Sequence, residues 1–227
     1  MTIAERLTQA RERIARAAER AGRDPNTVRL VAVSKTHPAS AIREAYEAGQ
    51  RDFGENYAQE LVRKAESLAD LPDLRWHMIG HLQTNKARLV APLVATVHTV
   101  DSPKLAVELG RRALAAGRTI NVLVEVNVAR DAAKSGCSPD QLGDVLAALR
   151  EQPALRTRGL MTIPPFTEDP EGARPYFAQL RELRDAHGGA EVLPELSMGM
   201  SHDVEVAVEE GATIVRIGTA IFGARPA

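Results

Sequence analysis

Short apolar segments recur along the chain, and a longer segment with helical spacing follows most of them. The first, Leu30–Ser34, reads Leu-Val-Ala-Val-Ser and lacks the strict alternation of a half-buried strand. An unbroken apolar run rich in valine indicates a strand covered on both faces, as in a parallel sheet. The pattern predicts strands at Leu30–Ser34, Asp52–Glu55, Arg75–Ile79, Thr96–Val100, Asn121–Asn127, Thr157–Ile163, Glu195–Met198 and Val215–Gly218.

Amphipathic helical patterns separate these strands, and strict alternation of strands with helices predicts an α/β protein with a parallel sheet. Eight such units in 227 residues fit one closed (β/α)8 TIM barrel, because barrels of roughly 200–250 residues often form single domains. We therefore expect one domain over residues 1–227. The predicted helices are Ala39–Ala48, Tyr57–Leu68, Thr84–Val90, Pro103–Ala116, Pro139–Arg150, Glu171–His187 and Asp203–Glu210.

An open doubly wound sheet is the rival architecture. It would carry a glycine-rich dinucleotide loop after its first strand, whereas this chain has Lys35-Thr36-His37-Pro38 there. One more helix is predicted before the first strand, where Thr2 and Glu5 suit a capping box. We expect this extra helix to cover the bottom of the barrel. Its apolar stripe is Ile3, Leu7, Ala10, Ile14 and Ala17.

Charge and composition narrow the choice of partner and compartment. The formal net charge of −1 gives no global field that would attract nucleic acid or an anionic membrane. The charged segment Met1–Arg20 lacks the apolar region of a secretory signal, and no run of about 18 apolar residues predicts a membrane span. The single cysteine, Cys137, excludes an internal disulfide and fits a reducing compartment. We expect a cytoplasmic protein in which Cys137 is a small packing residue.

Lys35 ends the first strand, where a lysine is the wrong residue for packing. Desolvating an ammonium group is costly, so a lysine at the mouth of a buried sheet tends towards the neutral amine. A neutral amine is a nucleophile that can form a Schiff base with a carbonyl compound. The alternative is a lysine that extends from the strand end into solvent.

Polar residues and glycines gather at the ends of the later strands, where barrels of this kind bind ligands. Ser201 precedes the predicted start of a helix, and Gly218-Thr219 ends the eighth strand. Loops after strands seven and eight commonly hold phosphate, and a hydroxyl with backbone N–H groups suits that ligand. A helix cap is the alternative reading for Ser201, and close packing is the alternative for Gly218.

Arg216 interrupts the apolar strand that surrounds it. A guanidinium group buried there needs an acceptor, which is either a ligand atom or a carboxylate such as Glu125 or Glu195. A Schiff-base lysine, a phosphate site and an arginine facing a ring nitrogen are together the protein contacts that pyridoxal 5′-phosphate (PLP) requires. The residues therefore point to PLP as the cofactor.

The motifs around these residues make the chain resemble the pyridoxal phosphate homeostasis protein family, also described as YggS-like. The resemblance runs from near residue 29 to the C-terminus. The segments that carry it are Val31–Lys35, Phe53–Tyr57, Trp76–Lys86, Lys134–Gly136, Gly159–Ile163, Leu196–Asp203 and Val215–Gly223.

The resemblance implies a barrel similar to the N-terminal domain of alanine racemase, with PLP bound to Lys35 as a Schiff base. It implies a carrier and regulator of PLP supply without enzymatic turnover, with PLP-dependent apo-enzymes as candidate recipients. The oligomeric state stays open between a monomer and a weak homodimer. It also assigns the remaining cofactor contacts. Ser201, Gly218 and Thr219 would hold the phosphate, Arg216 would approach the pyridine nitrogen, and Asn56, His77 and Met198 would surround the ring.

Three other functions remain as alternatives. A PLP-dependent amino-acid racemase needs a second base opposite Lys35, and neither His77 nor His81 is an evident one; with the chain ending at Ala227, we expect no second domain to supply it. An aldolase would use Lys35 without PLP. A zinc site at His77 and His81 lacks the helical scaffold and the adjacent glutamate of that motif, so no metal is expected. Whether Lys134 holds a second PLP stays open beside its reading as a surface lysine.

Overall fold

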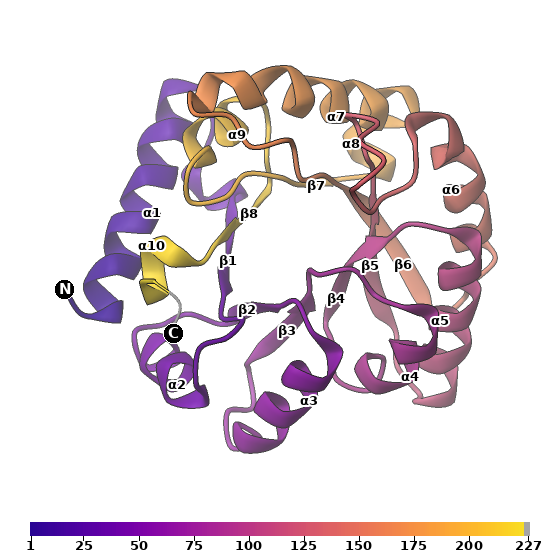
Figure 1. Cartoon of the computed structure of the whole chain (residues 1–227), viewed down its shortest axis with the longest axis horizontal. Coiled ribbons are helices and arrows are strands. Elements are labelled where there is room, and N and C mark those ends of the chain that lie inside the picture. The colour runs from indigo at the N-terminus through magenta and orange to yellow at the C-terminus, as the bar shows by residue number, and fades with distance from the viewer. Residues whose placement is uncertain (225–227) are drawn as a thin grey trace.

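The computed structural model describes residues 1–224 and shows a closed barrel of eight parallel strands in chain order (Figure 1). β1 pairs with β2 on one side and with β8 on the other, which closes the sheet. The predicted (β/α)8 fold is therefore confirmed; residues 225–227 of the predicted domain lie outside the described residues. The strands are β1 Arg29–Val33, β2 Asp52–Glu55, β3 Arg75–Met78, β4 Thr96–Val100, β5 Ile120–Glu125, β6 Leu155–Met161, β7 Glu195–Ser197 and β8 Ile214–Ile217.

Helices surround the barrel, and most begin and end within a few residues of the predicted bounds. The predicted helix Thr84–Val90 is a 3₁₀ turn followed by α4. The pattern missed α8, which follows Gly188 and begins at Gly189, both with positive φ. The helices are α1 Ile3–Arg20, α2 Ala39–Glu47, α3 Ala58–Ser67, α4 Ala87–Val90, α5 Pro103–Ala115, α6 Leu142–Arg150, α7 Arg174–Ala186, α8 Gly189–Val192, α9 Val204–Glu209 and α10 Thr219–Phe222. None of the helices within residues 1–224 combines the length and apolar character needed to cross a membrane.

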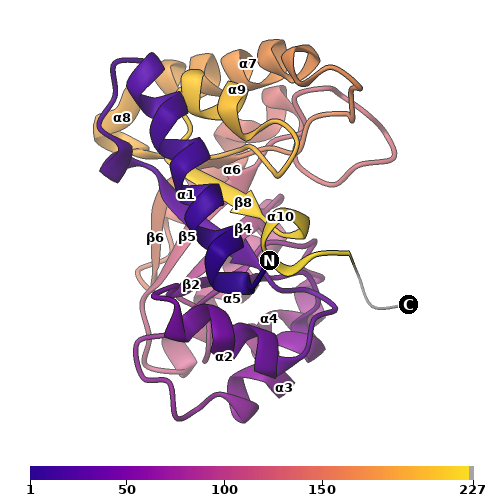
Figure 2. The same cartoon turned by 90° about the vertical axis from the view of Figure 1, so that its left-hand side faces the viewer.

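The position expected for α1 was wrong. The helix begins at the predicted capping box, in which Thr2 and Glu5 cap each other's backbone, but it lies in the outer ring and not across the bottom. It packs against α2, α9 and α10, and Figure 2 shows it running along the side of the barrel. The reason is that the helices after β7 and β8 are short, so the buried stripe of α1 fills the remaining place in the ring. Ion pairs from Arg13 to Glu205 and from Arg20 to Glu209 fix it there.

The interior of the barrel is partly polar. Most apolar side chains, Phe53 and Leu196 among them, belong to one large cluster, while Val31, Leu123, Met161 and Ile214 form a separate small one. Several buried side chains in the strands are polar or charged, which is why the strand patterns were not uniformly apolar. These are Asp52, Glu55, His77, Thr96, His98, Thr99, Glu125, Glu195, Ser197 and Arg216.

Candidate cofactor-binding site

A cavity of about 250 Å³ lies at the carboxyl ends of β1 and β8, where the sequence predicted a site. Six of the eight predicted site residues line it; His77 and Met198 do not. The other five lining residues were not predicted, although most of them also lie near strand ends. The complete lining is Val33, Lys35, Asn56, Ile79, Ile163, Met200, Ser201, His202, Arg216, Gly218 and Thr219.

Lys35 is half-buried and lies two residues after the end of β1, with Ser34 between them. The next residue, Thr36, has φ 66°, a left-handed conformation that is strained for a β-branched side chain. The Thr36 N–H donates to Glu60 Oε1 at 2.7 Å, which compensates for part of that strain. The sharp turn therefore redirects the chain two residues after β1 and leaves Lys35 at the wall of the cavity.

The buried Lys64 of α3 holds the backbone on the other side of Lys35. Its Nζ donates to the Ser34 carbonyl oxygen, to Glu55 Oε1 and to Glu60 Oε1, each at 2.7 Å. Burial raises the pKa of Glu55, while the Lys64 ammonium and the Ser34 hydroxyl act in the opposite direction. Since Lys64 and Glu60 bind the residues before and after Lys35, this network determines where Lys35 sits.

The guanidinium group of Arg216 is buried and lines the cavity. Nη1 donates to Ser197 Oγ at 2.6 Å and Nη2 donates to the Thr162 carbonyl oxygen at 3.0 Å. Within residues 1–224 it forms no ion pair; the predicted partner Glu195 pairs with Arg29 and Arg158 instead. Burial lowers the pKa of Arg216 to about 10, so it stays cationic at neutral pH. An arginine has five N–H donors, so donors remain for a ligand.

Behind Arg216 a chain of hydrogen bonds crosses the barrel interior. Ser197 Oγ lies 2.9 Å from His98 Nδ1, and His98 Nε2 lies 2.9 Å from His77 Nδ1. His77 Nε2 is 2.9 Å from Asp52 Oδ1. Burial lowers the pKa of His98 well below its usual value. With His98 neutral and Arg216 donating to Ser197, the hydrogen bonds can all run one way: Ser197 donates to His98, His98 to His77, and His77 to the Asp52 carboxylate.

Asp52 completes this chain on the far side from Arg216. Burial alone would raise its pKa, but hydrogen bonds from Arg75 and His77 outweigh that effect and hold the pKa far below the usual range. Arg75 contacts it through two nitrogens at 2.8 and 2.7 Å. His77 is 1% exposed and therefore lies inside the barrel, not in the cavity wall. Met198 is fully buried in the large apolar cluster.

Ser201 lies in a turn before α9 and does not cap it, so the helix-cap alternative is wrong. α9 begins at Val204, and Asp203 is its N-cap residue; the Asp203 carboxylate accepts the Met200 N–H at 2.6 Å. The Ser201 carbonyl oxygen accepts from Arg13 Nη2 of α1 at 3.1 Å. The turn is thus held from two sides, and Ser201 lines the cavity.

Gly218 and Thr219 also line the cavity, at the start of α10. A Cβ atom added at Gly218 would lie 3.2 Å from the Val33 carbonyl oxygen, so close packing against β1 is one reason for glycine here. The first N–H groups of a helix have no partner within the helix, so they are available to an acceptor. Close packing is therefore confirmed for Gly218, and phosphate binding there stays a prediction.

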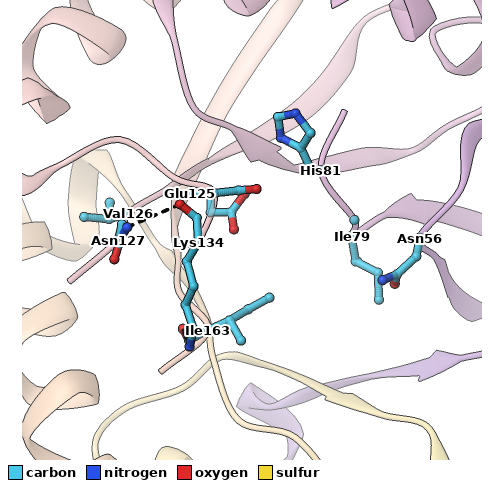
Figure 3. A pocket seen from close by; sticks show the side chains of 10 residues that line it. Asn56, Ile79, His81, Glu125, Val126, Asn127, Lys134 and Ile163 are labelled. Carbon is cyan, nitrogen blue, oxygen red and sulfur yellow. Dashed lines mark hydrogen bonds between the residues drawn. The ribbon is translucent and has the colours of Figure 1, made fainter. Parts of the chain in front are cut away.

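A second cavity of about 200 Å³ adjoins the first and shares Asn56, Ile79 and Ile163 with it. Figure 3 shows Glu125 facing into this space and Lys134 extending along its wall towards Ile163. The Lys134 ammonium donates to the carbonyl oxygens of Pro164 at 2.7 Å and Ile163 at 3.3 Å. Its side chain is half-buried, so it is not a plain surface lysine.

His77 and His81, the two residues of the zinc alternative, lie in different environments. His77 is buried and bonded to His98, whereas His81 pairs with Asp101 at 3.3 Å with half of its side chain exposed. Within residues 1–224 no three His, Cys, Asp or Glu side chains gather where they could hold a metal ion. Cys137 is buried, and burial raises the pKa of its thiol to about 12.

Comparisons with known proteins agree with this geometry. The family model for the N-terminal domain of alanine racemase matches residues 6–226. A pyridoxal phosphate homeostasis protein of Aquifex aeolicus is 49% identical over 227 residues, covering 99% of each chain. One of Pseudomonas aeruginosa is 52% identical over 225 residues, covering 99% of this chain and 96% of its own.

Solved structures show the same fold. PipY of Synechococcus elongatus PCC7942, solved with PLP bound, is 43% identical and superposes with a TM-score of 0.85, covering 98% of this chain and 100% of its own. An alanine racemase of Streptomyces lavendulae is 18% identical with a TM-score of 0.71; the match covers 99% of this chain and 58% of that enzyme, and shows the fold alone. The chain therefore belongs to the alanine racemase N-terminal domain family and, within it, to the pyridoxal phosphate homeostasis proteins.

Proposed function

We propose that the protein binds PLP in the cavity at the ends of β1 and β8 and takes part in the intracellular homeostasis of this cofactor. One observation carries the proposal: Lys35 and the cationic Arg216 line the same cavity, together with the hydroxyls of Ser201 and Thr219. An aromatic aldehyde with a phosphate group matches that set of donors. The names of the relatives and the PLP bound by PipY support the same ligand.

Each lining group has a proposed task. The hydroxyls of Ser201 and Thr219 and the backbone at Gly218 would bind the phosphate, because hydroxyl and N–H donors suit an anion at a helix start. Arg216 would donate to the pyridine nitrogen, and Lys35 would be joined to the aldehyde carbon. PLP supplies an electrophilic carbon and an electron-accepting ring. The side chains proposed to lie around that ring are Asn56, Val33, Ile79, Ile163 and Met200.

His77 and Met198 lie behind the wall of the proposed PLP site and do not line it. Met198 is packed in the apolar cluster, and His77 acts on Arg216 only through His98 and Ser197. We assign both residues to the support of the site. The expectation that they surround the ring came from the resemblance to the family, and a motif does not reveal how deep a side chain lies within the barrel.

The nature of Arg216 favours a carrier over an enzyme. A carboxylate at this position would keep the pyridine nitrogen protonated and the ring a strong electron acceptor. A guanidinium group does not give up its proton, so it leaves that nitrogen neutral and the ring a weaker electron acceptor. The relatives are named as homeostasis proteins and not as enzymes, which supports this reading. The racemase alternative is supported only by the shared fold.

The proposal also covers the location, the oligomeric state and the partners of the protein. We assign it to the cytoplasm, as a monomer or weak homodimer that passes PLP to PLP-dependent apo-enzymes. The lone, buried cysteine supports a reducing compartment. The near-zero net charge supports a protein that acts without nucleic acid or a membrane.

The visible absorption spectrum of the purified protein tests the proposal. We expect a PLP band that shifts on borohydride treatment in the wild type and is absent in Lys35→Ala, because only a covalently bound cofactor is fixed by reduction. Lys134→Ala is the matched control and should keep the band, since Lys134 lies in the second cavity. A colourless protein that takes up no added PLP would overturn the proposal and leave the Schiff-base aldolase as the better reading.

A further inference from the structure

The second cavity holds a carboxylate that the proposed PLP site does not use. Glu125 ends β5 and is 6% exposed, and its Oε2 atom is buried without a hydrogen-bond partner in the described part of the chain. An unpaired buried acceptor costs free energy comparable with a lost hydrogen bond. Figure 3 shows the carboxylate directed into the cavity, towards His81 and away from the strand that carries it.

The groups around Glu125 leave its carboxylate uncompensated. His81 lines the same cavity but pairs with Asp101, and the Lys134 ammonium is engaged by two carbonyl oxygens. Burial and repulsion from Asp101 raise the pKa of Glu125 to about 7, while the charge of Arg216 acts against them. Cys137 is also close, but its thiol remains neutral because burial raises its pKa. A cationic donor entering the cavity would therefore find an acceptor without a competitor.

The position of the cavity determines which cation it suits. Its walls continue into those of the cavity that contains Lys35, through Asn56, Ile79 and Ile163. A compound that lies here would be next to the amine of Lys35 and to the carbon that this amine would hold. Compounds that react with such a carbon in exchange for a lysine are primary amines.

We propose that the second cavity is a binding site for small primary amines, with Glu125 accepting hydrogen bonds from their ammonium group. The choice of amines rests on the proposed PLP site, whereas the recognition of an ammonium group rests on Glu125 alone. Charge-assisted hydrogen bonds of this kind are short and about twice as strong as neutral ones. An amine bound at this site would lie beside Lys35 before PLP leaves the protein.

The test uses ethylammonium chloride as the probe and protein from which PLP has been removed with hydroxylamine. Amide chemical shifts in ¹H–¹⁵N spectra are followed at pH 8, with potassium chloride at equal concentration as the reference. We expect saturable shifts at Gly80, Asn127 and Ser135, which line the cavity. Glu125→Gln should weaken binding at least about tenfold, because it removes a hydrogen bond to a charged group.

Glu195→Gln is the matched control, since Glu195 is also buried with an unpartnered Oε2 but lies at the start of β7, away from the cavity. It should leave the affinity within about twofold of the wild type. Tetramethylammonium chloride has the charge but no N–H donor and should cause no saturable shifts. Equal binding to wild type and Glu125→Gln, or equal loss in both variants, would overturn the proposal. Because no PLP is present, a failure of the PLP proposal would leave this result unchanged.

Discussion

At the scale of single residues, the site depends on buried polar groups that touch no ligand. Lys64 binds the carbonyl oxygen before Lys35, and Glu60 binds both Lys64 and the N–H of Thr36. A charged pair buried this deeply is costly to form, but removing one member costs more because the other is left uncompensated. Lys64 therefore positions Lys35 and holds the Glu55 carboxylate within the barrel.

Replacing Lys64 by methionine is the direct test of this role. Lys64→Met keeps most of the side-chain volume and leaves Glu55 without its cation. We expect the free energy of unfolding in urea to fall by about 3–5 kcal/mol. The double variant Lys64→Met with Glu55→Gln should recover part of the loss, because the uncompensated carboxylate is then absent.

An exposed pair supplies the contrast. Arg43 and Asp70 form a salt bridge in which both side chains are largely exposed, and such pairs contribute about 0–1 kcal/mol. Arg43→Met should therefore change the unfolding free energy by less than about 1 kcal/mol. Similar losses in Arg43→Met and Lys64→Met would show that the buried network has no special role.

The sequence predicted individual lining residues well but not their supports. Lys35, Ser201 and Arg216 were found because each follows or interrupts an apolar strand, which is a local signal. The chain from Ser197 through His98 to His77 joins three strands, and its members are 99 and 21 residues apart. Such contacts depend on the register between strands, which a local pattern does not contain.

At the scale of elements, α1 supports both segments proposed to bind phosphate. Arg13 donates to the Ser201 carbonyl oxygen, and Arg6 donates to the Ile221 carbonyl oxygen in α10 at 3.3 Å. The capping box and the apolar stripe predicted this helix and its buried face, but they do not show which elements that face packs against. Its place in the ring depends on how short α9 and α10 are, so the expectation of a bottom cover failed.

Loss of the Arg13 contact should weaken PLP binding. In Arg13→Met the turn at Ser201 loses one hydrogen bond and the ion pair to Glu205, while the lining of the cavity is unchanged. A hydrogen bond of roughly 1 kcal/mol corresponds to an increase of about fivefold in the dissociation constant of PLP, measured by absorption titration.

Arg16→Met on the same helix is the control. Within the described residues Arg16 forms its hydrogen bond and ion pair with Glu12, and both side chains are exposed. Its dissociation constant should match that of the wild type. If both variants bound PLP as the wild type does, α1 would serve the fold and not the site.

At the scale of the whole molecule, a carboxylate buried at the mouth of the barrel lowers the stability of the fold. Strand alternation predicted the closed sheet, because eight parallel strands with intervening helices have few other arrangements. The pattern also placed Glu125 at the end of β5, yet nothing local indicated that its Oε2 would be buried without a partner. Whether this oxygen is buried and unpaired depends on which side chains of the neighbouring strands lie at the same height in the barrel.

This carboxylate gives the unfolding free energy a predictable dependence on pH. The pKa of Glu125 is raised to about 7 in the folded protein from its ordinary value of 4.5. Below pH 4.5 both states carry the proton and the group has no effect; as pH rises towards 7 the unfolded chain ionises first, so stability is lost. Glu125→Gln removes this loss.

The variant should therefore gain stability relative to the wild type as pH rises. At pH 5, half a unit above the unfolded pKa, the difference from this cause should be about 1 kcal/mol. At pH 8 the variant should be more stable by on the order of 3 kcal/mol, the equivalent of the pKa shift. Urea unfolding at the two pH values measures the difference, and because only the change between them matters, any constant effect of the glutamine cancels. A stability difference that is the same at pH 5 and pH 8 would mean that Glu125 ionises as freely in the folded barrel as in the unfolded chain, and the cavity would then lack the uncompensated carboxylate on which amine binding depends.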